Sequence, residues 1–510
     1  MFDPEFYLGV YEVESLKTGA KCLRSGKYRD LAECGPCEEI KLDSPQNVTM
    51  DRHTLYCVPV PAESDWKAFF LNLIYAFAKS SVCDLHNTSP STSVTSEQMK
   101  RPLDEDKISC PEADLNNEAD LVSMEVEVNV AESKKTKIDA SDEDGKSVKE
   151  YFDLNFPLPN EKGPACIVKM YQLDESVKLN DVVEVTGILS NHPAMASFPD
   201  RKQAEKSSAL LDPSPDLMEG MEETSSSAPP PSLVPRLHAI SVCQLQHNNP
   251  LLSSAAGSVI QGEAVLAEAG VLRDQLMTVL TQLFAGDHVA AEYLLCHLIS
   301  SVYARRDVAA VGKFALNLSG CPPGVSFPKL LHEFIKQLVT KCYLLPLSLE
   351  NMNKLSLVPK KDYKVNRLKS GILQLSNGTH LILDETALQP GQLDSNGVAN
   401  MTALGNMISW QKLDYDFSFH KQEFLTDIIP LVLSEGKSII KLIEEDFVNT
   451  RKEDSSKMSI DDFHSLLLLS RLLSLTYGKK SLTQEIWNRA KLLEVERKTR
   501  LVLTSVPQNR

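Results

Sequence analysis

The stretch "THLILDETALQPGQL", residues 379–393, is an apolar run that ends on the paired carboxylates Asp384 and Glu385. Its short length and β-branched and leucine content are typical of a buried strand. An acidic pair at the end of such a strand is the arrangement that holds Mg²⁺ beside a bound nucleotide. A glycine-rich phosphate loop with a lysine should then lie upstream, but the chain contains no GxxxxGK[ST] motif.

The region around this stretch alternates helical and strand patterns. From residue 270 onward, helical segments of ten or more residues are interspersed with short apolar strands, and 370–386 reads as a pair of strands. Strands that alternate with helices indicate an α/β domain with a largely parallel sheet. The tail from Ser459 is predicted to be helical throughout, with Ser459 as its N-cap.

The N-terminal half is strand-rich. Residues 1–60 alternate apolar and polar side chains, and two further strands are predicted within 152–171 and 178–190. A short turn at Asn180 and Asp181 precedes the second strand, and Gly187 allows it to bend. Residues 232–245 form another strand that returns to the sheet. Together these segments resemble the strand pairs of a small closed barrel such as the OB-fold.

Composition excludes several classes of function. The 510 residues carry 53 Lys and Arg against 69 Asp and Glu, a net charge of −16, which disfavours binding to a phosphate backbone. We find no signal peptide and no membrane-spanning run, so the eleven cysteines are expected to be reduced thiols in the cytosol or nucleus. The CGPC of Cys34–Cys37 is interpreted as a loop with incidental thiols, and neither metal nor cofactor is expected.

The segment "FAGDHVAAEYLL", residues 284–295, resembles the phosphate loop of the AAA+ domain in minichromosome maintenance (MCM) helicase subunits. Matched from Gly286 and Asp287, the position of the loop lysine falls on Glu292 and that of the magnesium-binding serine on Tyr293. A carboxylate would repel a triphosphate, and a phenol is too large to replace a hydroxymethyl group. This resemblance implies a nucleotide site that no longer binds nucleotide.

Two more segments are similar to the same helicase domain. The stretch 370–388 resembles its acidic strand, with Asp384 and Glu385 at the magnesium carboxylates. The stretch 458–475 resembles its lid helix, and the sensing arginine of that helix falls on Asp461. The resemblance therefore implies a degenerate AAA+-like domain with a helical lid and with no catalytic residues.

Longer motifs, among them "FDPEFYLGVYE", "FDLNFPLPNEKGPACIVK", "DYKVNRLKSG" and "WQKLDYDFSFH", resemble the family of MCM complex-binding proteins nearly from end to end. Compared with that family, the chain lacks an N-terminal segment, which predicts a missing first barrel strand. Its residues 66–85 do not match, and a helical stretch after residue 438 is absent. The predicted organisation is a strand-rich part at 1–83, a disordered polar insertion at 84–150, an OB-like region at 151–255 with a Pro/Ser-rich loop at 194–231, a degenerate AAA+-like domain at 256–438, and a helical lid and tail at 439–510.

The family resemblance implies a nuclear, non-enzymatic regulator of DNA replication, cell division and mitosis. Its expected partners are MCM helicase subunits, with chromatin contacted only indirectly, no direct nucleic acid and no membrane. It would promote unloading of the MCM complex and support sister-chromatid cohesion. Arg305 and Arg306 are candidate partner contacts, but the pattern favours a solvated helix end, where the helix dipole stabilises cations. Two alternatives remain, a residual ATP-binding protein that uses Asp384 and Glu385, and a single-strand binder that uses the OB-like region.

Overall fold

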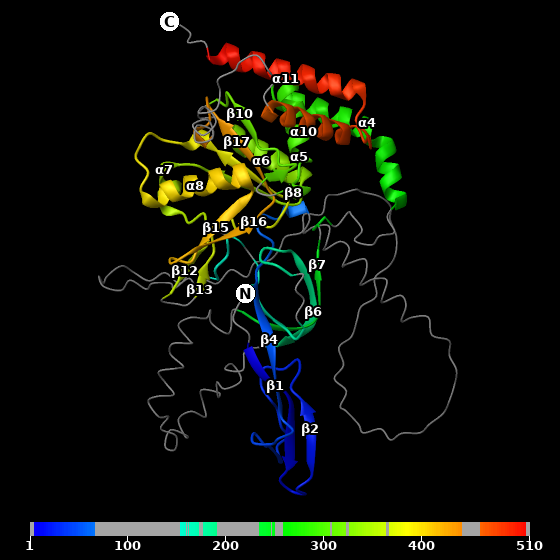
Figure 1. The fold of residues 1–510 in the computed structure, drawn as a ribbon, viewed down its shortest axis with the longest axis vertical. Coiled ribbons are helices and arrows are strands. Elements are labelled where there is room, and N and C mark those ends of the chain that lie inside the picture. The colour runs from blue at the N-terminus through cyan, green and yellow to red at the C-terminus, as the bar shows by residue number, and fades with distance from the viewer. Residues whose placement is uncertain are drawn as a thin grey trace, which may run out of the picture. The chain divides into compact units, whose positions relative to one another are not determined.

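A seven-stranded sheet and a four-stranded parallel sheet form the framework of the protein (Figure 1). The computed structural model describes residues 5–66, 154–159, 161, 163–172, 177–190, 234–245, 247–249, 259–306, 309–322, 326–363, 367–440 and 460–505. Side chains at 259–265, 460–461 and 502–505 are outside this description. The predicted insertion at 84–150 and loop at 194–231 also lie outside the described residues, as does the predicted N-cap Ser459.

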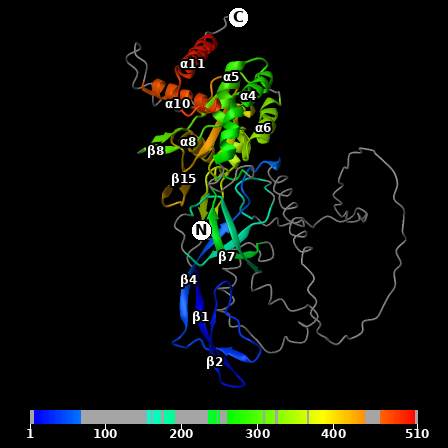
Figure 2. The same ribbon diagram turned by 90° about the vertical axis from the view of Figure 1, so that its right-hand side faces the viewer.

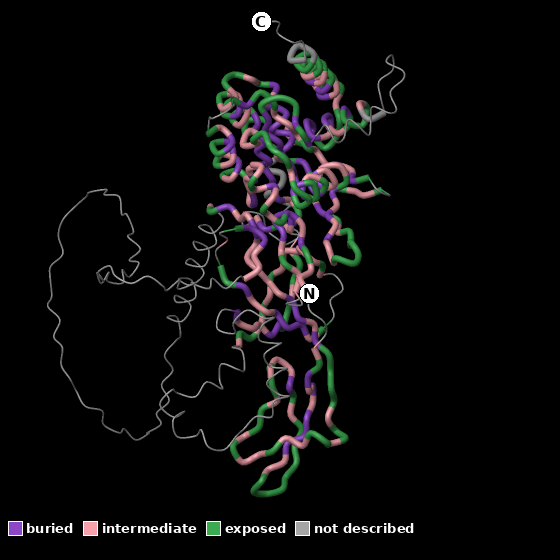
Figure 3. Tube along the Cα trace, turned by 90° about the vertical axis from the view of Figure 1, so that its left-hand side faces the viewer, coloured by how far each residue is buried: buried purple, intermediate pink, exposed green. Residues whose placement is uncertain are grey.

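The N-terminal sheet contains strands, as the sequence predicted, and its first strand mixes buried and more exposed positions along its length (Figure 3). In β1, Tyr7, Tyr11 and Val13 are buried. The strand order is β2-β1-β4-β5-β7-β6, with β3 paired to β1, and only β5 and β7 run parallel. The strands are β1 (Glu5–Ser15), β2 (Lys21–Ser25), β3 (Glu38–Ile40), β4 (Val48–Cys57), β5 (Cys166–Met170), β6 (Val183–Ser190) and β7 (Arg236–Gln244).

The strand order and an irregularity at Gly187 distinguish this sheet from a simple closed barrel. The strands β5 and β6, although consecutive in the chain, are not neighbours in the sheet, because β7 lies between them and pairs with both. Gly187 does mark an irregularity: the β6–β7 register shifts at Thr186/Gly187, and a Cβ there would lie 2.3 Å from the His238 carbonyl oxygen. The strand order is an open path with no pairing between β2 and β6 among the described strands, so a closed OB-like barrel is not confirmed.

The C-terminal sheet is entirely parallel, in the order β10-β17-β14-β11. All six residues of β14 are buried, since parallel strands are covered on both faces and read as continuous apolar runs. The apolar start of the quoted stretch, residues 379–384, is therefore a strand, as predicted. These strands are β10 (Leu316–Ser319), β11 (Cys342–Pro346), β14 (Thr379–Asp384) and β17 (Ile428–Ser434).

Helices cover both faces of this parallel sheet (Figure 2). The alternating side chains of β14 separate the two layers, because Ile382 packs with α4, α5 and α6 whereas Leu381 and Leu383 pack with α7 and α8. A third cluster joins α5 to α10 and α11. The helices are α4 (Val259–Leu283), α5 (His288–Leu298), α6 (Phe327–Leu338), α7 (Leu349–Lys354), α8 (Ser395–Trp410), α10 (Ile460–Thr476) and α11 (Gln484–Ser505). None of these described helices has the length and apolar character required to cross a bilayer.

Three local predictions in this half are corrected. Residues 370–377 lie outside any strand, whereas the sequence predicted the first strand of a pair there. Leu373 and Leu375 in this segment are buried, but they make no strand pairing. The tail after α10 is not helical throughout, since residues 479–483 are outside any helix. Arg305 and Arg306 lie in a hairpin of β8 (Ala304–Arg306) and β9 (Ala309–Val311), not at a helix end.

A smaller sheet flanks the α7–α8 layer, in the order β13-β12-β15-β16. Its β15–β16 pair is a hairpin whose buried residues Leu413 and Tyr415 belong to the same core as α7 and α8. The strands are β12 (Lys360–Asp362), β13 (Arg367–Lys369), β15 (Lys412–Asp416) and β16 (Lys421–Leu425).

Two histidines are enclosed between α5 and β14. The ring centroids of His297 and His380 are 6.0 Å apart, and both side chains are buried. Burial lowers the pKa of His297 to about 4, and burial together with the charges of His297 and Lys341 lowers the pKa of His380 to about 3. Both pKa values lie below the ordinary 6.5, so folding favours the neutral form of each ring.

We therefore expect the protein to lose stability as the pH falls from 6.5 towards 4. The unfolded chain binds protons at these histidines before the folded chain does, which costs about 2 kcal/mol for each histidine between pH 7 and pH 5. Chemical denaturation at several pH values should show this slope. A double variant, His297→Asn with His380→Asn, should have a correspondingly shallower slope. Equal slopes in the two proteins would contradict the assignment.

Candidate functional site

The turn predicted to be a phosphate loop connects two helices. Gly286 and Asp287 lie between α4 and α5, whereas a phosphate loop joins a strand to a helix. Asp287 is the N-cap of α5, and its carboxylate accepts hydrogen bonds from the Val289 and Ala290 amides at 3.0 and 3.1 Å. Arg500 Nη1 of α11 also lies 2.7 Å from this carboxylate. The helix N-terminus is thus filled by the protein's own anion, and the predicted location of the loop is wrong.

Glu292 is buried and is bound by two arginines. Its Oε1 accepts from Arg273 Nη2 of α4 at 2.5 Å, and its Oε2 accepts from Arg489 Nη2 of α11 at 2.6 Å. Arg273 also lies 4.0 Å from the centroid of the Tyr477 ring. The sequence suggested that this carboxylate faces a phosphate site. Instead, the buried Glu292 carboxylate joins three helices by pairing with the buried Arg273 and the partly exposed Arg489.

Tyr293 belongs to the same helical layer. Its hydroxyl donates to Glu494 Oε2 of α11 at 3.0 Å, and its ring stacks on Phe314 with centroids 6.4 Å apart. Burial and the Glu494 charge raise the pKa of Tyr293 well above its ordinary value. A cavity of about 550 Å³ borders this layer, with Arg273, Thr281, His288 and Glu292 among its lining residues.

Asp384 and Glu385 lie at the carboxyl end of β14, as predicted, but each is committed to a local structural contact. Asp384 accepts hydrogen bonds from the Thr386 amide at 3.0 Å and from the Thr386 hydroxyl at 2.6 Å. Glu385 accepts from the Ser438 hydroxyl at 2.7 Å and from the Ile439 amide at 3.2 Å. Glu385 thereby anchors the segment that follows β17, and no hydrogen bond or ion pair links either carboxylate to Glu292 or Tyr293 within the described chain.

The topology identifies a different position for a ligand crevice. From β10 the chain crosses on the α6 face to β11, and it then returns through α7 and α8 on the opposite face to β14 and β17. Open α/β sheets bind ligands outside the carboxyl ends of neighbouring strands whose connections leave on opposite faces. In the described sheet β10 leaves on the α6 face and β14 leaves on the α8 face, so the switch point lies between these two strands, at the carboxyl end of β17. The described residues after β10, 320–322, begin the connection from β10 to α6, which is the strand-to-helix position of a phosphate loop.

The described part of this crevice is closed by backbone hydrogen bonds. The Gly320 amide donates to the Glu435 carbonyl at 3.2 Å, and the Cys321 amide donates to the Ser434 carbonyl at 3.1 Å. Burial raises the pKa of the Cys321 thiol to about 11, and the nearby charge of Asp384 adds to the rise. Sequence reasoning missed this loop, although glycines and prolines directly after an apolar strand, "LNLSGCPPG" at 316–324, were a readable signal.

The remaining predicted residues are only partly available for contacts. Arg305 donates to the carbonyls of Gln411, at 3.4 Å, and of Thr426, so its guanidinium is committed inside the domain. Burial also lowers the pKa of Arg305. Arg306 is exposed on the same hairpin. Asp461 lies in α10, but its side chain is outside the described atoms.

A second cluster of buried charges lies in the N-terminal sheet. Asp30 is 2.9 Å from Lys169 Nζ and 2.8 Å from Arg236 Nη1, and Glu5 is 3.0 Å from Arg52 Nη2 and 2.9 Å from the same Lys169. Burial opposes ionisation, but hydrogen bonds from Arg52 and Lys169 lower the pKa of Glu5 to about 2. In the same way, contacts with His238 and Lys169 outweigh burial and hold the pKa of Asp30 well below its usual range.

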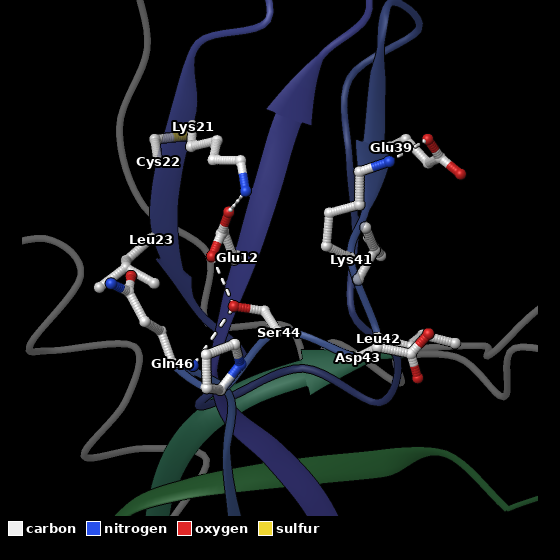
Figure 4. A pocket seen from close by; sticks show the side chains of 12 residues that line it. Glu12, Lys21, Cys22, Leu23, Glu39, Lys41, Leu42, Asp43, Ser44 and Gln46 are labelled. Atoms are coloured by element: carbon white, nitrogen blue, oxygen red, sulfur yellow. Dashed lines mark hydrogen bonds and ion pairs between the residues drawn. The ribbon is translucent and has the colours of Figure 1, made fainter.

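A cavity of about 940 Å³ lies between β1, β2 and the chain around β3 (Figure 4). Within this cavity, the Glu12 side chain points towards Lys21, and the Glu12 carboxylate lies 2.9 Å from Lys21 Nζ. The same carboxylate accepts a hydrogen bond from the Ser44 hydroxyl. The buried carboxylate is thus neutralised by its own neighbours. No group of three or more metal-ligating side chains occurs among the described residues, so nothing in this part of the chain indicates a metal centre.

Comparisons with known proteins match the chain to one family. The profile of the mini-chromosome maintenance replisome factor family matches residues 1–442 and 439–501. The chain is 42% identical to the chicken (Gallus gallus) mini-chromosome maintenance complex-binding protein, over 98% of this chain and 87% of that protein. It is 40% identical to the human protein of the same name, over 98% and 87%, and 31% identical to that of Drosophila melanogaster, over 98% and 88%. The chain therefore belongs to the family of mini-chromosome maintenance complex-binding proteins.

Proposed function

We propose that the protein is a non-enzymatic binder of MCM helicase subunits that acts in the nucleus during DNA replication. It promotes disassembly of the MCM complex and its unloading from chromatin, and so supports sister-chromatid cohesion. Family membership over 98% of the chain carries this proposal, because relatives named for MCM complex binding span the same residues.

The parallel sheet supports a degenerate AAA+-like domain. Acidic residues remain at the carboxyl end of β14, beside the topological switch point. In the loop after β10, where a phosphate loop would lie, the Gly320 and Cys321 amides donate to the protein's own carbonyls. A domain with this arrangement keeps the shape of an ATPase subunit while offering no phosphate cradle in its described residues.

The mechanism we infer is competition. A pseudo-subunit can occupy the surface through which one AAA+ domain contacts the next, without contributing ATP-dependent closure of the ring. Because a ligand shifts an equilibrium only by its differential affinity for the two states, it must bind open or dissociated MCM more tightly than the closed ring. About 10⁴-fold preference would convert a population that is almost entirely closed into one that is almost entirely open.

Binding of the full chain to each purified MCM helicase subunit tests this proposal. We expect saturable binding to at least one subunit and accumulation of dissociated MCM when the chain is added to an assembled complex. A charge reversal, Arg306→Glu, tests the exposed arginine of the β8–β9 hairpin, and unchanged binding would remove it from the interface. Failure of every subunit to bind would refute the proposal.

Nucleotide binding separates this proposal from the residual-ATPase alternative. We expect a fluorescent ATP analogue to show no saturable binding in the presence of Mg²⁺, because the described amides of the switch-point loop already donate to carbonyls. Magnesium-dependent saturation would favour the ATPase instead.

A further inference from the structure

The tip of the β15–β16 hairpin presents an exposed pair of aromatic rings. We use the name aromatic tip for residues 417–420 together with Tyr363. Phe419 is 86% exposed, more than any other large apolar side chain in the described chain, and Tyr363 is 51% exposed. The two ring centroids are 5.4 Å apart at an interplanar angle of 65°, an edge-to-face contact. Isolated exposed apolar residues are common, but a contacting pair at a protruding turn is a typical protein anchor.

Hydrogen bonds hold the aromatic tip in one conformation. The Tyr363 hydroxyl donates to the Phe417 carbonyl at 2.7 Å, and the Ser418 amide donates to Asp416 Oδ1 at 2.7 Å. The Phe417 ring stacks on His420 with centroids 5.1 Å apart and an angle of 4°. An anchor that is already ordered loses little conformational entropy when it binds, so its burial contributes more fully to affinity.

The base of the hairpin is equally well fixed. Leu413 and Tyr415 of β15 are buried in the core beneath α8, and the rings of Tyr415 and Phe424 have centroids 4.3 Å apart. The exposed ring therefore stands on a rigid support that belongs to the parallel-sheet domain, as a preorganised binding element requires.

The surface beside the aromatic tip has an excess of cations although the whole chain carries a net charge of −16. Two of its carboxylates are engaged in ion pairs, Asp362 with Lys369 at 2.8 Å and Asp416 with Lys360 at 3.7 Å. Across β12, β13, β15 and β16 the cations are Lys360, Lys361, Arg367, Lys369, Lys412 and Lys421, and the anions are Asp362, Asp414, Asp416 and Glu423. A partner surface that complements this region is acidic around an apolar centre.

We propose that the aromatic tip docks into an apolar pocket with an acidic rim on an MCM helicase subunit. This inference rests on the proposed function and names the element that makes the contact. A protein fits better than single-stranded nucleic acid, because ion pairs with Asp362 and Asp416 already neutralise two of the lysines. Lys412 is likewise paired with Glu423 at 2.8 Å, and phosphate binding requires an uncompensated basic groove.

The test compares full-length variants in binding assays with each purified MCM helicase subunit. Phe419→Ser removes the anchor, and Phe419→Trp retains an aromatic ring. Phe6→Ser is the matched control, because Phe6 is 75% exposed but lies on β1 of the N-terminal sheet. We expect Phe419→Ser to weaken binding about 30-fold, in line with the loss of an aromatic anchor, while Phe419→Trp and Phe6→Ser stay within about threefold of the unchanged chain. The thermal unfolding of all three variants should match that of the unchanged chain, because both positions are exposed.

The outcomes separate this inference from the proposed function. If the unchanged chain binds no MCM subunit, the proposed function fails. If the unchanged chain binds and Phe419→Ser binds equally well, the docking inference alone is overturned. Equal losses in Phe419→Ser and Phe6→Ser would overturn it too. A labelled single-stranded oligonucleotide is the competing probe, and binding to it that Phe419→Ser abolishes would replace the protein partner with nucleic acid.

Discussion

Replacing Glu292 with glutamine is expected to destabilise the helical layer of α4, α5, α10 and α11 by about 3 kcal/mol. The change leaves Arg273 without a countercharge, and the Arg273 side chain is only 8% exposed. Arg489 is 34% exposed, so water compensates part of its loss. Chemical denaturation followed by circular dichroism measures the effect. Glu485→Gln, on the exposed surface of α11, is the matched control and should change stability by less than about 0.5 kcal/mol.

A lysine at the same position makes a sharper test of the sequence comparison. Glu292→Lys would supply the cation that a phosphate loop at 284–295 requires. The structure instead places the new charge against Arg273 and Arg489. We expect unfolding of the helical layer and no gain in binding of an ATP analogue. A folded Glu292→Lys protein that binds the analogue with saturation would restore the original assignment of the phosphate loop.

Asp30→Asn is expected to cost a comparable amount, about 3–5 kcal/mol, in the N-terminal sheet. Without this carboxylate, Arg236 loses its ion pair with Asp30, and Arg52 and Lys169, each 2% exposed, keep only the Glu5 carboxylate. Removing one partner of a buried ionic cluster leaves the others uncompensated. Denaturant unfolding at neutral pH gives the magnitude, and Asp43→Asn, at an exposed turn, is the matched control.

The pH dependence of the same variant adds a readout that a packing defect would not produce. The pKa values of Asp30 and Glu5 are lowered in the folded state, so their contribution is present above about pH 4 and is lost as the pH falls towards 2. Asp30→Asn should therefore lose less stability than the unchanged chain over this acid range. Parallel pH profiles would contradict the assignment.

Much of the fold could be predicted from local patterns. Alternation in residues 1–60 predicts the strands of the N-terminal sheet, and the apolar run before Asp384 predicts a buried strand, because each depends only on side-chain period and the burial of one or two faces. Local patterns could not predict that β5 and β6 are separated in the sheet. Chain neighbours are often sheet neighbours, but β7 enters between them from 46 residues beyond the end of β6.

The candidate site was predictable only in part, since half of it depends on distant partners. The position of Asp384 and Glu385 follows from the strand that precedes them. The contacts of these carboxylates do not, because Glu385 bonds to Ser438, 53 residues away. The sequence also could not show that Gly286 joins two helices, because an apolar segment before a glycine fits either a strand or the end of a helix.

By itself the sequence determined the periodic elements, the acidic end of the buried strand and the family to which the chain belongs. Only the tertiary structure decided where the switch point lies and what neutralises each buried charge. Glu292 is matched by Arg273, 19 residues before it, and by Arg489, 197 residues after it. A buried carboxylate must find its countercharge in space, and the packing of helices distant in the chain, rather than any local pattern, brings that countercharge within hydrogen-bonding distance.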